Sequence, residues 1–128
     1  MVITRAIRRW VYNKYNGHCA YCGERIEFNA FHVDHIKPVR EMNGEMDYPE
    51  NDTIENMVPA CRSCNIRKGS GSVEFFRAEM ERAVKVLRRD SVTFKFAERY
   101  GQIKCTPCKV RFYFEQFKEE KNDSGKQI

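Results

Sequence analysis

The sequence predicts one small α+β domain stabilised by metal-binding cysteines. Its 128 residues are close to the length of a single average domain, enough for a modest core. Stretches with apolar residues at helical spacing alternate with short stretches of strand character. All six cysteines fall in pairs separated by two residues, the spacing at which two thiolates turn toward one metal ion.

Composition excludes several other classes of protein. Hydrophobic residues make up 41% of the chain, too many for a disordered segment, and 6 cysteines are too few for a disulfide-dense scaffold. The sequence has neither an apolar run of about 20 residues nor a signal-peptide core, so we expect a cytoplasmic protein that is neither secreted nor membrane-bound. The net charge of +5 favours a polyanionic partner.

The first elements are a helix and a strand around the first cysteine pair. Apolar residues at helical spacing predict a helix over residues 2–15, which Asn16 and Gly17 end. Residues 28–36 have strand character, and Pro38 closes that strand.

The second cysteine pair is predicted to join a strand to a helix. A polar stretch over residues 40–52 reads as a loop, and residues 57–60 as a second short strand. A short helix over 61–68 follows and is stopped by Gly69.

The last part of the chain is predicted to be a helical extension with a terminal strand. Ser72 caps a helix over residues 73–89, and a shorter helix covers 93–100. Alternating apolar residues predict a strand over 109–115. We therefore expect a single domain over residues 1–118, with a core at 19–69, an extension at 73–117 and a polar tail at 119–128.

The first two cysteine pairs predict a structural zinc site. In a reducing compartment, paired thiols hold metal more often than they form disulfides. Gly23 supplies a permissive backbone for a tight turn after the first pair. Four thiolates fill a tetrahedral zinc completely and leave no open position for substrate. The predicted ligands are Cys19, Cys22, Cys61 and Cys64.

The third pair, Cys105 and Cys108, has alternative interpretations. A redox pair of this spacing leads into a helix, whereas the residues after Cys108 are expected to form a strand. We therefore interpret this pair as a turn or an incomplete second metal site. A thiol-redox protein is the competing function for this pair, and a helix after Cys108 would favour it. A zinc deaminase needs a His-x-Glu segment paired with Pro-Cys-x-x-Cys, which the sequence lacks in that form.

Two segments between and after the first pairs carry a more specific pattern. They read Val33-Asp34-His35-Ile36-Lys37-Pro38 and Asn56-Met57-Val58-Pro59-Ala60-Cys61-Arg62-Ser63-Cys64-Asn65-Ile66-Arg67-Lys68-Gly69. Over residues 19–69 this pattern resembles the HNH nuclease motif, and the remaining chain resembles the tails of small phage-type members. The resemblance implies a ββα-metal fold, in which two antiparallel strands and a helix surround one divalent ion.

The resemblance also implies a metal-dependent DNA endonuclease and assigns roles to its residues. His35 becomes the general base, Asp34 and Asn65 hold Mg²⁺ or Mn²⁺, and Asn56 supports the loop that orients the base. Lys68 is placed near the phosphate. These residue types suit phosphodiester hydrolysis, which needs a base near neutral pH and hard oxygen ligands for a cation. The implied products carry 5′-phosphate and 3′-hydroxyl ends.

Binding to DNA is expected to run through phosphate contacts in a bacterial or phage-infected cell. A dimer or a partner protein is expected where double-strand cutting or sequence specificity is needed. The alternative function is a zinc-stabilised nucleic-acid-binding module without turnover. We expect His18 to be a bystander of the zinc site and His32 to lie at the surface. The expected phosphate-binding residues are Arg62, Arg67, Lys68 and Lys37.

Overall fold

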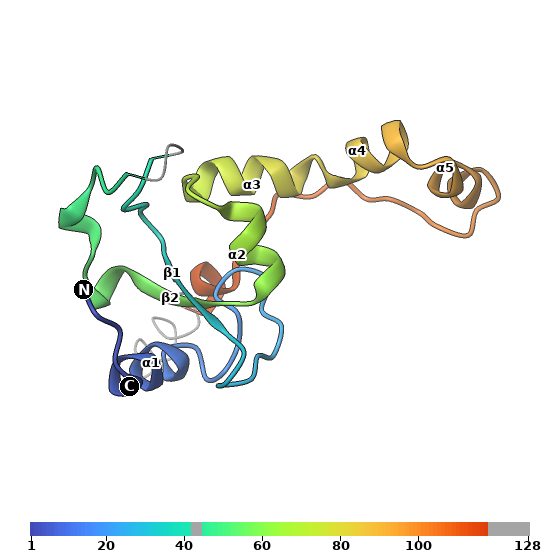
Figure 1. Cartoon of the computed structure of the whole chain (residues 1–128). Helices are drawn as coiled ribbons and strands as arrows, with labels where there is room; N and C mark the ends of the chain where they lie inside the picture. The colour runs from blue at the N-terminus through green and yellow to red at the C-terminus, as the bar shows by residue number, and fades with distance from the viewer. Residues whose placement is uncertain (42–44, 118–128) are drawn as a thin grey trace, which may run out of the picture.

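A computed structural model describes residues 1–41 and 45–117 of the chain. Within these residues, helices surround one two-stranded sheet, which confirms the predicted α+β class (Figure 1). Among the described helices, none combines the length and apolar character needed to cross a bilayer.

The sheet consists of β1 (His32–His35) and β2 (Met57–Ala60), which pair antiparallel. His35 lies opposite Met57 in the last pair of the ladder, so the predicted catalytic histidine lies at the end of the strands. The second strand has the predicted bounds. The first is shorter than predicted because residues 28–30 form a turn, closed by the hydrogen bonds of Ala30 and Phe31 to the Glu27 carbonyl.

The described part of the connection between the strands is mostly irregular, as predicted, but two short turns of 3-10 helix shape its end. These are η1 (Pro49–Asn51) and η2 (Ile54–Asn56). They bring the chain back to the start of β2 and place Asn56 beside the residues that follow β1, since Ile36 donates its backbone N–H to the Asn56 carbonyl.

Helix α2 (Arg62–Lys68) follows β2 directly and confirms the predicted short helix. Its N-cap is Cys61, whose sulfur accepts the backbone N–H of Cys64 at 3.4 Å. The helix ends at Gly69, whose φ of +53° lies in the region that favours glycine. The helix is therefore fixed at one end by a predicted zinc ligand and at the other by a turn.

Helix α1 (Arg5–Asn13) packs against β2 and the segment before β1. Val11 is fully buried, and the Arg8 guanidinium donates to the carbonyls of Phe28 and Phe31 while lying over the Phe31 ring. Lys14, just after the helix, donates to the Met57 carbonyl at 2.7 Å. These contacts hold the outer face of the sheet in place.

The predicted helix over residues 73–89 is interrupted at Arg82. It forms α3 (Val73–Glu81), capped by Ser72 as predicted, and α4 (Ala83–Asp90). Phe76 is fully buried, whereas Leu87 is 43% exposed. Only the first half of the predicted helix packs against the core. Packing therefore does not require one continuous helix. Helix α5 (Val92–Arg99) follows, close to its predicted bounds.

The predicted strand over residues 109–115 is wrong. Residues 103–112 have no regular structure, and residues 113–117 are helical. Phe112 is inserted into the core, where its ring stacks on Phe76 with centroids 5.1 Å apart. The alternating apolar pattern therefore serves aromatic packing and not a strand ladder. The predicted tail over 119–128 lies outside the described residues.

The core lies between the sheet, α3 and this C-terminal segment, and Tyr21 is at its centre. The Tyr21 ring makes edge-on contacts with Phe76 and Phe112, at 5.4 and 5.5 Å between centroids. Phe114 and Tyr113 donate backbone N–H groups to the Ala20 and Tyr21 carbonyls. The loop with the first cysteine pair is thus part of the core.

Candidate functional site

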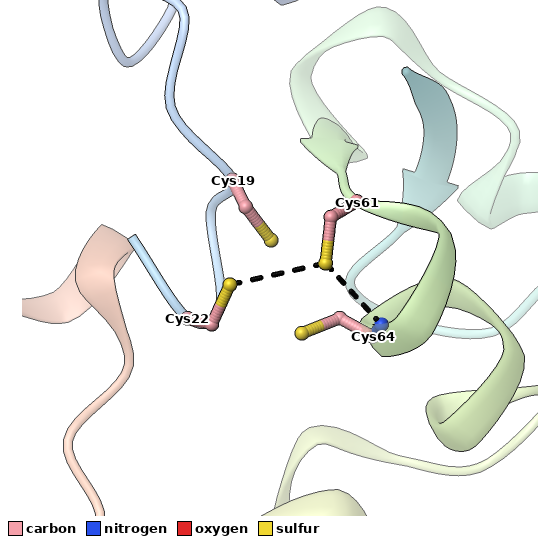
Figure 2. A group of neighbouring side chains, drawn as sticks. All are labelled: Cys19, Cys22, Cys61 and Cys64. Atoms are coloured by element: carbon pink, nitrogen blue, oxygen red, sulfur yellow. Dashed lines mark hydrogen bonds between the residues drawn. The ribbon is translucent and has the colours of Figure 1, made fainter. Parts of the chain in front are cut away.

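Four cysteines from two distant parts of the chain converge at one point (Figure 2). Their sulfur atoms all lie within 4.8 Å of one another, and those of Cys22 and Cys61 are 3.8 Å apart. Zinc–sulfur bonds of about 2.3 Å in a tetrahedron place neighbouring sulfur atoms about 3.8 Å apart. The donor set and its spacing therefore fit a structural zinc. The four residues are those predicted: Cys19, Cys22, Cys61 and Cys64.

Backbone hydrogen bonds shape the first pair into a knuckle. Gly23 donates its N–H to the Cys19 carbonyl at 3.0 Å, and its φ of +79° allows the turn predicted after the second cysteine. A Cβ at Gly23 would lie 3.1 Å from the Tyr113 ring, so space also favours glycine. Ala20 donates to the Pro59 carbonyl of β2 at 2.8 Å, which ties the knuckle to the sheet.

The thiols share charge unequally. A hydrogen bond from Cys64 lowers the pKa of Cys19 to about 4, and the same contact raises the pKa of Cys64. Burial raises the pKa of Cys22 to about 11. Negative charge therefore favours the Cys19 sulfur over those of Cys22 and Cys64, and a divalent cation at the centre would compensate it.

Asp34 and His35 line one hollow of about 370 Å³ at the end of β1. Neighbouring side chains on a regular strand point to opposite faces. Here β1 ends at His35 and the chain turns away, so both residues reach the same hollow. Asp34 is 9% exposed, whereas His35 is less buried. Lys68 and Gly69 of the α2 end line the hollow from the other side.

Two buried groups hold the Asp34 carboxylate. The Tyr21 hydroxyl donates to Oδ2 at 2.5 Å, and the Lys68 ammonium lies 3.1 Å from the same oxygen. Burial, reinforced by the Asp34 charge, raises the pKa of Tyr21, so its hydroxyl remains a donor. Lys68 is 2% exposed and also donates to the His35 carbonyl at 2.8 Å. Its ammonium is thus held inside the protein beside the predicted metal ligand.

His35 has a carboxylate partner that the sequence did not reveal. Its Nε2 lies 3.0 Å from Oδ1 of Asp52, which lines the same hollow. The Met1 ammonium, and to a lesser extent His35, lower the pKa of Asp52 and keep it ionised. Asp52 lies in the polar loop before β2, where nothing in the sequence sets it apart from other acidic loop residues.

Asn56 joins the two ends of the connection between the strands. Its amide nitrogen donates to the carbonyls of Lys37 and Asn51, each at 2.8 Å, and its Oδ1 accepts the Lys37 N–H at 3.0 Å. These bonds fix the backbone directly after His35. The Asn56 side chain thus connects the segment after β1 to the end of η1.

The other predicted residues are not among the described residues that line the hollow. Asn65 is half-buried on α2, three residues before Lys68, and is not among the described residues that line the hollow. Three basic residues are exposed, two on α2 and one after β1. They are Arg62, Arg67 and Lys37.

The remaining histidines and cysteines stand apart. His18 contacts the Tyr15 carbonyl through Nδ1 at 3.1 Å, and His32 is exposed on β1. Within the described residues, the cluster of metal-binding groups contains neither of them, nor Cys105 and Cys108. The latter two line a separate hollow with α3 and α4 residues.

The hollow also suits a hard divalent cation. Both contacts to Asp34 described above end on Oδ2, so neither of them occupies Oδ1. Mg²⁺ is typically held by one or two carboxylates and retains several waters. The buried Asp34 carboxylate, with the Asp52 carboxylate lining the same hollow, fits such a site.

Comparison with known proteins finds similarity over this region. Residues 19–71 match the model of a family described as HNH endonuclease. Over 55 residues the chain is 42% identical to the CRISPR-associated endonuclease Cas9 of Corynebacterium diphtheriae, an alignment covering 43% of this chain and 4% of that protein. The crystal structure of the Type II-C Cas9 enzyme from Actinomyces naeslundii aligns with a TM-score of 0.48 and 21% identity, over 59% of this chain and 7% of that one. The chain thus spans a small fraction of either relative.

Proposed function

We propose that residues 19–71, which match the HNH endonuclease family model, form a nuclease domain, and that the chain is a metal-dependent DNA endonuclease. The observation that carries the proposal is that Asp34 and His35, adjacent in sequence, line the same hollow beside buried Lys68. A general base, a hard oxygen ligand and a fixed positive charge then meet within the domain that the family uses for hydrolysis.

His35 serves as the general base. The contact between its Nε2 and Asp52 favours the tautomer with a proton on Nε2, which leaves Nδ1 to accept a proton from the attacking water. Asn56 contributes indirectly, because its three hydrogen bonds hold the backbone that follows His35. Both residues therefore keep the imidazole in a fixed position before substrate arrives.

Asp34 and Asn65 are the proposed ligands of Mg²⁺ or Mn²⁺. When bound, the cation supplies positive charge where negative charge accumulates on the phosphate. Tyr21 and Lys68 hold Asp34 in position, and the Lys68 ammonium adds a fixed charge near the phosphate. Products with 5′-phosphate and 3′-hydroxyl ends follow from water attack on phosphorus with the 3′ oxygen leaving.

The cysteine cluster serves as a structural zinc site. Zinc joins the knuckle before β1 to the start of α2, so it fixes the two segments that carry Tyr21 and Lys68. The exposed side chains of Arg62, Arg67 and Lys37 are proposed to contact neighbouring phosphates. A dimer or a partner protein supplies double-strand cutting or sequence specificity where these are needed.

Supercoiled plasmid incubated with the zinc-loaded protein tests the proposal. Mg²⁺ or Mn²⁺ should give open-circular or linear DNA, and EDTA should prevent it. Ligation of the nicked product without prior end repair tests the predicted end chemistry. Plasmid that is bound but never cut under any metal condition favours the second candidate, a zinc-stabilised binding module without turnover.

A further inference from the structure

The positive charge of the chain is concentrated in one segment. Residues 82–111, here called the arm, contain nine lysines and arginines but only two acidic residues. The arm has an excess of seven positive charges, whereas the whole chain has an excess of five. The rest of the chain, including the nuclease domain, therefore carries two more acidic than basic residues, and most of the attraction to a polyanion must come from the arm.

The arm projects from the body of the protein. In Figure 1, α4 and α5 extend away from the sheet, and the chain returns from α5 toward the core. Neither helix contains a buried residue. Val92 and Tyr100 are 62% and 80% exposed, so the arm contributes little to the core and presents most of its side chains outward.

The few acidic groups of the arm are already paired. Arg88 binds Glu98 at 2.5 Å, and Arg89 binds Asp90 at 2.7 Å. Four lysines spread along the arm form no ion pair within the described part of the chain, and their charges are available to a ligand. They are Lys85, Lys95, Lys104 and Lys109.

We propose that the arm is a second DNA-binding element, which contacts phosphates distant from the one that is cut. That the ligand is DNA rests on the proposed function. That the arm binds it rests on the charge and the exposure of the arm. A backbone-directed contact of this kind adds affinity without sequence specificity and is strongly salt-dependent. The arm thereby supplies affinity that the acidic body lacks.

The test measures binding without cleavage. Full-length zinc-loaded protein carrying His35→Ala is titrated into a short labelled DNA duplex, and fluorescence anisotropy gives the affinity between about 50 and 200 mM salt. A second protein also carries Lys85→Gln, Lys95→Gln, Lys104→Gln and Lys109→Gln. The matched control has arginine at the same four positions. Zinc content and circular dichroism establish that all three proteins are folded.

The slope of log K against log salt is negative, and each lost phosphate contact lowers its magnitude by about 0.9. We expect the glutamine variant to lose about two to four units of slope and to bind at least about tenfold more weakly at low salt, while the arginine control keeps both. An unchanged slope and affinity of the glutamine variant would overturn the inference. Because no cleavage is measured, a failure of the proposed catalysis leaves this result interpretable.

Discussion

The hydroxyl of Tyr21 donates to the Asp34 carboxylate at 2.5 Å, which joins the zinc knuckle to the candidate catalytic residue. Tyr21 lies between Cys19 and Cys22, and its ring is buried against Phe76 and Phe112. The knuckle therefore does more than close the fold, because it also fixes the position of a predicted metal ligand.

Replacing Tyr21 with phenylalanine should weaken both stability and cleavage. The change removes a hydrogen bond to a buried carboxylate, worth about 1.5–3 kcal/mol, while keeping the ring. Urea denaturation measures the loss. Tyr12→Phe is the matched control, because its hydroxyl donates to the neutral Ile26 carbonyl and its loss should cost only about 1 kcal/mol. Equal costs for the two variants, with normal cleavage by Tyr21→Phe, would contradict the assignment.

Cys61→Ser should abolish zinc binding and cooperative folding. A structural zinc contributes about 10–16 kcal/mol in apparent binding energy, comparable with the whole stability of a small domain. Metal analysis of the purified protein should give one zinc per wild-type chain and none for the variant. Cys105→Ser lies outside the cluster and should keep its zinc. A Cys61→Ser protein with full zinc content and unchanged melting would refute the zinc assignment.

Lys68→Met should destabilise the fold strongly. It leaves the Asp34 carboxylate without its cationic partner at a site where Lys68 is 2% exposed. Breaking a buried ion pair in this way costs about 3–5 kcal/mol. Arg67→Gln, at the neighbouring exposed position, should change stability by no more than about 0.5 kcal/mol. Chemical denaturation of both variants measures the change in the free energy of unfolding. Similar small changes for the two variants would mean that the fold does not require the Lys68 ammonium.

Asn56→Asp should slow cleavage while the protein keeps its zinc. Aspartate has the size of asparagine but lacks the two donors that reach the Lys37 and Asn51 carbonyls. The backbone after His35 then shifts, and a small misplacement of a catalytic group costs about 100-fold in rate. Initial rates of plasmid cleavage measure the effect, with exposed Asn13→Ala as the control. A rate near that of wild type would show that Asn56 does not position the base.

Local signals explain which elements could be predicted from the sequence. Strand β2 has its predicted bounds, and helix α2 has nearly its predicted bounds because Gly69 is a clear stop signal in the sequence. The terminal strand was predicted wrongly because alternating apolar residues also suit an irregular segment that inserts Phe112 into an aromatic cluster. Periodicity alone does not report whether a partner strand exists.

The candidate site also has parts that local sequence predicts and parts that only the tertiary structure reveals. The four cysteines converge as their spacing predicted, since the two-residue spacing is itself the geometric requirement of a metal site. The partners of the candidate catalytic residues depend on tertiary structure, so Tyr21 and Asp52 carry no sequence signal beyond being polar groups near the motif. For the same reason, the burial of Lys68 could not be predicted from its place on a short basic helix.

The most direct test of the proposed hydrolysis compares wild type and His35→Ala on supercoiled plasmid with Mg²⁺, at equal zinc content and equal thermal stability. We predict that the wild-type protein cuts the plasmid and that His35→Ala does not, although both bind it. Cleavage by His35→Ala at the wild-type rate would contradict the account.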